Sequence, residues 1–205
     1  MENGMKRLAR FAGPAAAVIF FAALFGFGAA LEGYLQSRFP VALLGAKGFS
    51  NATAFNLLAF VLPGVLAGVV TLDLRQRLPG NAGWPLRIGA QLLFLSALGF
   101  IAMGLLPLDP EDLESHSSRL HGTAWMLWCV SFISGAVLLG AGLLRVHGWT
   151  LFGKLTLISV AGVLAAAFLL SGFLPAGIAQ RLAFALWFAW LILAGSKYGT
   201  EEREL

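Results

Sequence analysis

Residues 121–144 read HGTAWMLWCVSFISGAVLLGAGLL and contain no Lys, Arg, Asp or Glu. An apolar stretch of about 20 residues is long enough to cross the hydrocarbon core of a bilayer as an α-helix. The stretch lacks the alternation of apolar and polar residues that a strand of a membrane β-barrel shows. Because backbone polar groups in lipid must be paired within the protein, we predict a transmembrane helix here.

Five further apolar segments repeat this pattern and predict an all-α membrane protein. The expected fold is a six-helix transmembrane bundle that uses residues 1–205 as a single transmembrane domain. The composition agrees, because 12% of the residues are charged, against about 25% in a soluble domain. The predicted helices cover about residues 11–34, 53–72, 86–106, 121–144, 151–174 and 178–194.

Two local features qualify these helices. The first one follows the basic residues Lys6, Arg7 and Arg10 and resembles a signal peptide, but it exceeds the usual apolar length of about 7–15 residues, so we predict that it is not cleaved. Pro63 removes a backbone donor inside the second helix and predicts a kink. Small residues in the spans are expected to allow close helix packing: Gly26, Gly28, Gly64, Gly68, Gly135, Gly140 and Gly142.

The basic residues predict the orientation of the bundle. Ten of the 14 Lys and Arg residues fall on one side: Lys6, Arg7, Arg10, Arg75, Arg77, Arg87, Arg145, Lys154, Lys197 and Arg203. The positive-inside rule places this side, and with it both termini, in the cytoplasm. The basic residues form no stripe along one face, so the net charge of +4 does not indicate nucleic-acid binding.

Five polar residues fall at one predicted depth, near the outward ends of the helices: Glu32, Asn56, Asp109, His121 and Arg181. A charge drawn into the apolar zone is costly and tends to pair. We therefore predict that the five residues surround one outward-facing cavity, in which Glu32 pairs with Arg181. The alternative is that the five residues lie at the membrane–water interface, where polar side chains cost little, and do not form a common site.

Three functions fit this arrangement. The favoured one is binding of a membrane lipid or another small amphipathic ligand by the five residues. The second is a membrane-embedded hydrolase or lipid-modifying enzyme, in which His121 acts as the base or as a metal ligand and Asp109 orients it. The third is a structural or partner-binding bundle.

No metal or cofactor is predicted. Asp109, Asp112, His116 and His121 are suitable ligand types. However, the spacing of the two histidines does not match a helical zinc pair, in which they lie four residues apart. The single Cys129 cannot form an intrachain disulfide and is expected in the core. Residues 51–53 form a formal glycosylation sequon, Asn-Ala-Thr.

Short motifs in a fixed order carry a family resemblance. They are FPVALLGA at 39–46, Asn56, Pro63-Gly64, LPLD at 106–109, LHG at 120–122 and GIAQRL at 177–182. This set resembles the DUF998 family of prokaryotic integral membrane proteins over residues 13–197. The resemblance implies a six-helix bundle in the plasma membrane with no established activity.

The resemblance also implies which polar positions recur in the family. They match residues 44–46, Asn56, Asp109, His121 and Arg181 of this chain. One position departs from the family pattern. The first outward loop has Arg38-Phe39-Pro40 where family members often carry a His or a Ser-rich start, so no hydrolytic role is implied there.

Overall fold

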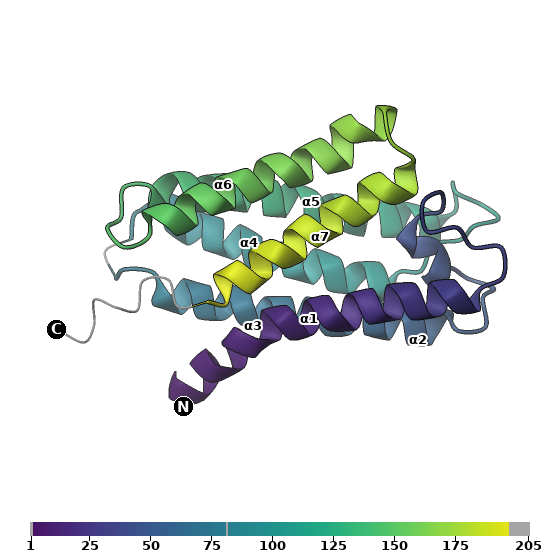
Figure 1. Cartoon of the computed structure of the whole chain (residues 1–205), viewed down its shortest axis with the longest axis horizontal. Helices are drawn as coiled ribbons and strands as arrows, with labels where there is room; N and C mark the ends of the chain where they lie inside the picture. Colours follow the sequence, from purple (N-terminus) through teal and green to yellow (C-terminus); the bar gives the residue numbers. More distant parts are fainter. Residues whose placement is uncertain (1, 81, 197–205) are drawn as a thin grey trace.

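The computed structural model describes residues 2–80 and 82–196, and its described elements are helices (Figure 1). Six of these helices are long and apolar enough to cross a membrane, which confirms the predicted fold class. They are Leu8–Ala30, Ala52–Arg77, Trp84–Leu105, His116–Leu143, Thr150–Leu169 and Ala176–Ala194. The predicted polar tail, with Lys197 and Arg203, lies outside the described residues.

The spans are built from both regular and irregular helical elements. The α-helices are α1 (Glu2–Ala30), α2 (Ala52–Asn56), α3 (Leu62–Arg77), α4 (Trp84–Leu105), α5 (His116–Leu143), α6 (Thr150–Leu164) and α7 (Ala176–Ala194). Two π-helical turns, η2 (Leu57–Val61) and η3 (Ala165–Leu169), continue the second and fifth spans. Two short 3₁₀ helices, η1 (Val41–Gly45) and η4 (Leu170–Gly172), lie outside them.

The irregularity predicted at Pro63 takes the form of the π-turn η2. Pro63 occupies the second position of α3, directly after η2. Proline has no N–H to donate and its ring crowds the carbonyl four residues earlier. A π-turn widens the helix by one residue per turn at this point, so the second span continues through Pro63 without ending.

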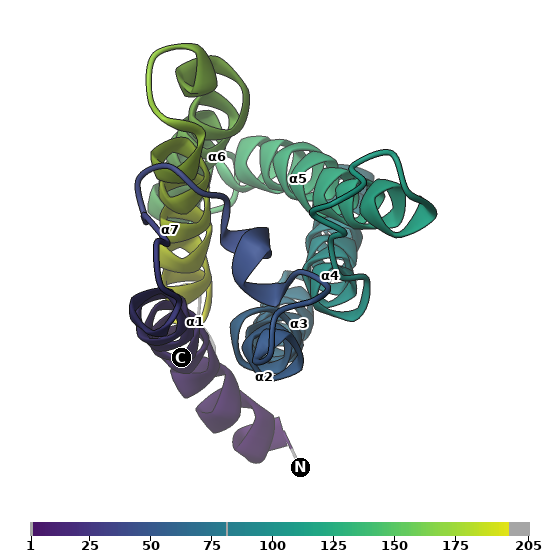
Figure 2. The ribbon, with the colours of Figure 1, turned by 90° about the vertical axis from the view of Figure 1, so that its right-hand side faces the viewer.

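The six spans form a closed ring in which each packs against two neighbours. Going around the ring, the order is α1, α3, α4, α5, α6 and α7, and α7 returns to α1. Figure 2 looks along the ring axis and shows this order. Consecutive spans run antiparallel (Figure 1).

Glycines set the closest helix contacts in the ring. A Cβ atom at Gly135 of α5 would lie 2.9 Å from the Gly89 carbonyl oxygen of α4, and one at Gly89 would lie 2.8 Å from the Gly135 oxygen. Gly140 and Gly153 face each other in the same way between α5 and α6. The packing role predicted for Gly135 and Gly140 is therefore confirmed.

Aromatic side chains fill the middle of the ring. Phe100 and Trp187 lie 4.5 Å apart between ring centroids, and Phe20 and Phe188 lie 4.8 Å apart. Trp128 belongs to the same cluster and is fully buried. Trp128 and Trp187 therefore pack in the core.

The two ends of the ring differ in what they carry. We call the end with residues 31–51, 106–115 and 170–175 the distal end (Figure 1, right). The other end, with the start of α1 and the end of α7, is the terminal end. At the terminal end the buried pair Asp73–Arg77 joins α3 to α7, because Arg77 also donates to the carbonyl oxygens of Ala194 and Ser196.

Candidate functional site

Arg181, in the second turn of α7, holds the start of the first loop (residues 31–51) at the distal end. Its Nε and Nη2 donate to Gln36 Oε1 at 3.0 and 2.7 Å. Nη2 also donates to Tyr34 Oη at 2.6 Å, and Nη1 donates to the carbonyl oxygens of Phe39 and Gly177 at 2.9 and 2.7 Å. A guanidinium has five N–H groups, so each has an acceptor, and every acceptor is neutral.

Tyr34 links Arg181 to the turn around Pro40. Its hydroxyl accepts from Arg181 and donates to the Pro40 carbonyl oxygen at 3.1 Å. Burial raises the pKa of Tyr34 above its ordinary value, and this effect exceeds the opposite one of the Arg181 charge. The phenol therefore stays protonated at neutral pH and keeps its hydrogen bond to Pro40.

The predicted pair between Glu32 and Arg181 is wrong. α1 ends at Ala30 instead of continuing to residue 34. Gly33 has φ +76°, a left-handed conformation that glycine adopts without a Cβ clash and that does not fit a helix. Glu32 is consequently an exposed loop residue, and Arg181 takes all its acceptors from other groups.

Asn56 fixes the second half of the first loop. Its side chain is buried at the end of α2, and Nδ2 donates to the Gly45 carbonyl oxygen at 2.8 Å. A Cβ atom at Gly45 would overlap the Asn56 amide group, so the contact requires glycine. The start of η1 is held separately, because Gln180 Oε1 accepts from the Val41 N–H at 2.8 Å.

Asp109 joins the third loop to the first. Its carboxylate lies 3.6 Å from Lys47 Nζ, and the Lys47 N–H donates to the Leu108 carbonyl oxygen at 2.8 Å. The Ser118 hydroxyl lies 3.0 Å from the Asp109 carbonyl oxygen. Asp109 therefore stabilises the contact between two loops.

His121 is oriented by a backbone carbonyl. It is buried in the second turn of α5, and its Nδ1 lies 2.8 Å from the Leu106 carbonyl oxygen at the end of α4. Because a carbonyl only accepts, Nδ1 carries the proton. Asp109 pairs with Lys47, so the orienting contact expected between Asp109 and His121 in the enzyme hypothesis is not formed.

The five predicted site residues thus share the distal end, as expected, but they have different partners. None of them lines the cavities described below. Their role in binding a ligand stays a prediction. Among the residues that the structure describes, no three His, Cys, Asp or Glu side chains are grouped so that they could hold a metal ion.

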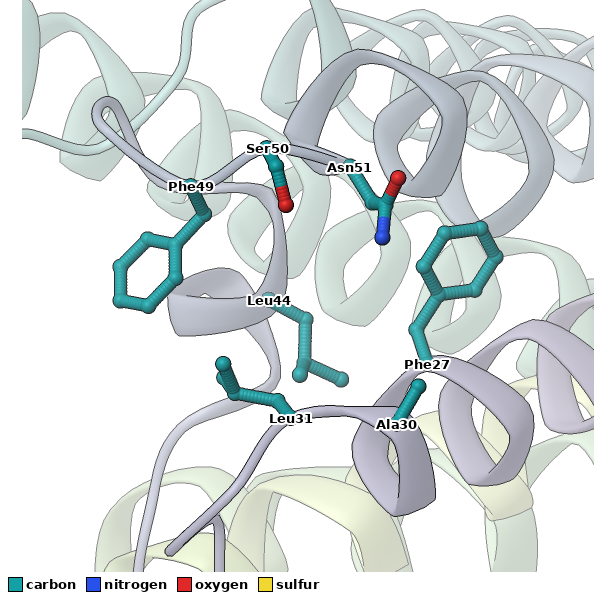
Figure 3. A pocket seen from close by; sticks show the side chains of 7 residues that line it. All are labelled: Phe27, Ala30, Leu31, Leu44, Phe49, Ser50 and Asn51. Carbon is teal, nitrogen blue, oxygen red and sulfur yellow. The ribbon is translucent and has the colours of Figure 1, made fainter.

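A small cavity lies under the first loop, between the end of α1 and the start of α2 (Figure 3). Its volume is about 70 Å³. It lies next to a larger open groove of about 580 Å³ between α1 and α2, and Phe27, Ala30 and Asn51 line both spaces. The cavity is lined by Phe27, Ala30, Leu31, Leu44, Phe49, Ser50 and Asn51. The groove is lined by Val18, Ile19, Ala22, Ala23, Gly26, Phe27, Ala30, Asn51, Ala54 and Leu58.

Ser50 and Asn51 supply the polar groups of this cavity. Figure 3 shows the Ser50 hydroxyl and the nitrogen of the Asn51 amide directed toward the space above Leu44. An Asn before a helix usually accepts a hydrogen bond from the first turn. Asn51 precedes α2 without such a bond. From the sequence, Asn51 was interpreted only as part of a sequon. Its position directly before a predicted helix could also have indicated a site residue.

Gly26 keeps the groove open. A Cβ atom at Gly26 would have no atom within 4 Å, so this glycine is not required for helix packing. The packing role that the sequence suggested for Gly26 is therefore wrong. The small side chains of Ala22, Ala23 and Ala30 on the same helix leave the rest of the groove unfilled.

Comparison with known proteins adds a family assignment. No curated protein and no solved structure shows significant similarity to the chain. The family described as "Protein of unknown function (DUF998)" matches residues 14–197, which is most of the chain. The match covers the second to sixth membrane-spanning helices in full and the first one from Pro14 onward. This multi-pass integral membrane protein therefore belongs to the DUF998 family.

Proposed function

We propose that the protein binds one membrane lipid in the groove between α1 and α2. The acyl chain lies in the groove, and the polar part of the lipid contacts Ser50 and Asn51 in the cavity under the first loop. The observation that carries the proposal is that the two spaces lie side by side and share Phe27, Ala30 and Asn51. An apolar groove that ends at two polar side chains matches the shape of an amphipathic molecule.

The groove suits an acyl chain in position and size. It runs along two membrane-spanning helices and opens to their surface, where lipid chains are the solvent. Apart from Asn51, every residue that lines it is apolar. Its volume of about 580 Å³ falls in the usual range of small-molecule sites, about 300–1,000 Å³.

The polar part of this lipid is expected to be uncharged where it meets the protein. The cavity offers a hydroxyl and an amide, which bind ester and hydroxyl oxygens equally well. Arg181, the basic residue among the predicted site residues, already donates all its N–H groups within the protein. We also place the protein in the prokaryotic plasma membrane with both termini in the cytoplasm, which the basic residues of the terminal end support.

Filling the groove at Gly26 tests the proposal. Gly26→Leu places a side chain in open space, so the variant should fold. Gly122→Leu is the matched control, because Gly122 lies in α5 and also has no atom within 4 Å of its Cβ position. Native mass spectrometry of protein extracted in mild detergent would measure co-purified lipid. We expect the lipid to be lost in Gly26→Leu and retained in Gly122→Leu.

The polar end is tested separately. Asn51→Ala should weaken retention by about tenfold, which corresponds to one or two hydrogen bonds. Equal lipid retention by Gly26→Leu and the wild-type protein, with both folded, would refute binding in the groove. Loss of lipid in Gly26→Leu with no effect of Asn51→Ala would refute only the assignment of the polar end.

A further inference from the structure

A second cavity, of about 530 Å³, lies at the terminal end, away from the groove. One wall comes from the loop between α3 and α4 and the first turn of α4, and the other from the end of α5 and the loop that follows it. The first wall includes Pro79, Gly83 and Leu86, and the second includes Gly142, Arg145 and His147. This cavity plays no part in the proposed function.

The charged residue that lines this cavity is basic, and no acidic residue balances it. Arg145 is exposed and, within the described residues, forms no ion pair or side-chain hydrogen bond. No acidic residue lines the cavity. A second guanidinium stands near the same wall, because Arg87 Nη2 lies 3.5 Å from the Gly80 carbonyl oxygen. A cationic cavity without an internal counter-ion attracts an anion.

The depth of the cavity indicates which anions it meets. Its lining residues lie just after α3, at the start of α4 and at the end of α5, so they lie where the membrane spans end. Trp84, beside Gly83, is 69% exposed, and exposed tryptophans are typical of the head-group layer. Basic cavities between helices at this level bind the head groups of anionic lipids.

We propose that the terminal-end cavity binds a phosphate group through Arg145, with Arg87 contributing to the positive potential. The phosphate belongs either to an anionic phospholipid or to a soluble phosphate ester, which present the same charged oxygens. A guanidinium recognises such oxygens through charge-assisted and bidentate hydrogen bonds. The site is independent of the groove between α1 and α2.

The test uses the full chain in mild detergent, with native mass spectrometry to measure binding. The probes are short-chain phosphatidylglycerol, short-chain phosphatidylcholine and glycerol 3-phosphate. Arg145→Gln removes the proposed contact, and Arg145→Lys keeps the charge. Arg75→Gln is the control, because Arg75 is an exposed arginine in the last turn of α3 that does not line the cavity.

We expect Arg145→Gln to raise the dissociation constant for phosphatidylglycerol about fivefold, the effect of one basic residue near an anionic head group. Arg145→Lys should restore most of the affinity, and Arg75→Gln should leave it unchanged. Competition by glycerol 3-phosphate supports a soluble ester as the source, and its failure to compete supports the lipid. Equal affinities of Arg145→Gln and wild type, or equal weakening by Arg75→Gln, would overturn the proposal.

Discussion

The groups that accept hydrogen bonds from Arg181 are all neutral. Replacing Arg181 should therefore release the first loop without leaving a carboxylate that has lost its partner. Arg181→Lys cannot reach Gln36, Tyr34 and Phe39 together, because an ammonium lacks the planar fork of a guanidinium. We expect the free energy of unfolding in detergent to fall by about 2–4 kcal/mol, the effect of losing hydrogen bonds from a charged donor.

Glu32 provides the matching control for this prediction. It is exposed and does not contact Arg181, so Glu32→Gln should change the free energy of unfolding by less than about 0.5 kcal/mol. The effects of Glu32→Gln and Arg181→Gln should add. A double variant that is more stable than Arg181→Gln alone would show that the two residues form an ion pair after all.

Gly45 and Asn56 are expected to behave as a coupled pair. Gly45→Ala places a methyl group on the Asn56 amide and should destabilise the protein by about 1–3 kcal/mol through overpacking. Asn56→Ala removes the amide and leaves the Gly45 carbonyl unpaired. In the double variant the steric clash is gone, so the two effects should be clearly less than additive in thermal unfolding. Strict additivity would mean that the two residues do not touch.

For single residues, the sequence predicts the depth in the membrane better than it predicts the hydrogen-bond partners. The five polar residues do lie at the distal end, because depth follows from distance along a helix. Their partners depend on how the helices are arranged sideways, and a single sequence does not reveal this. The turn at Gly33 places Glu32 in the loop after α1. Gln36 and Tyr34 accept the hydrogen bonds of Arg181, the role that the sequence analysis had given to Glu32. Ser50 and Asn51 were not expected in a site.

Helix packing makes different demands on glycines that look alike in the sequence. Gly135 faces backbone atoms of α4, which cannot move aside, whereas Gly26 faces open space. Gly135→Ala should therefore destabilise the protein by about 1–3 kcal/mol. Gly26→Ala should be neutral or stabilising by up to about 1 kcal/mol, because alanine favours the helix. Equal unfolding midpoints of the two variants in detergent would contradict the packing described here.

The elements themselves were largely predictable. Six apolar segments of sufficient length predict six spans, and all six are present. The ends were less accurate. α1 stops at Ala30, before the turn around Gly33. The second span continues to Arg77, and its last turn contains the ion pair between Asp73 and Arg77. The closure of the ring between α7 and α1 depends on packing between distant segments, which no local pattern indicates.

The orientation of the whole molecule is a prediction that labelling can test. In a Cys129→Ala background, Glu111→Cys of the third loop should react with an impermeant thiol reagent added to intact cells. Gly80→Cys should react only after the membrane is opened, because it lies at the opposite end of the bundle, among the basic residues. Both positions are exposed. Labelling of Gly80→Cys in intact cells would reverse the orientation.

The most direct test of lipid binding between α1 and α2 is photo-crosslinking with a lipid that carries a diazirine in its acyl chain. After extraction and detergent exchange, only retained lipid remains to react, and peptide mass spectrometry locates the adducts. We predict adducts on groove residues such as Val18 and Leu58 and few on Ile158, which is 67% exposed on α6 and outside the groove. Adducts spread equally over Ile158 and the groove residues would contradict a specific lipid site.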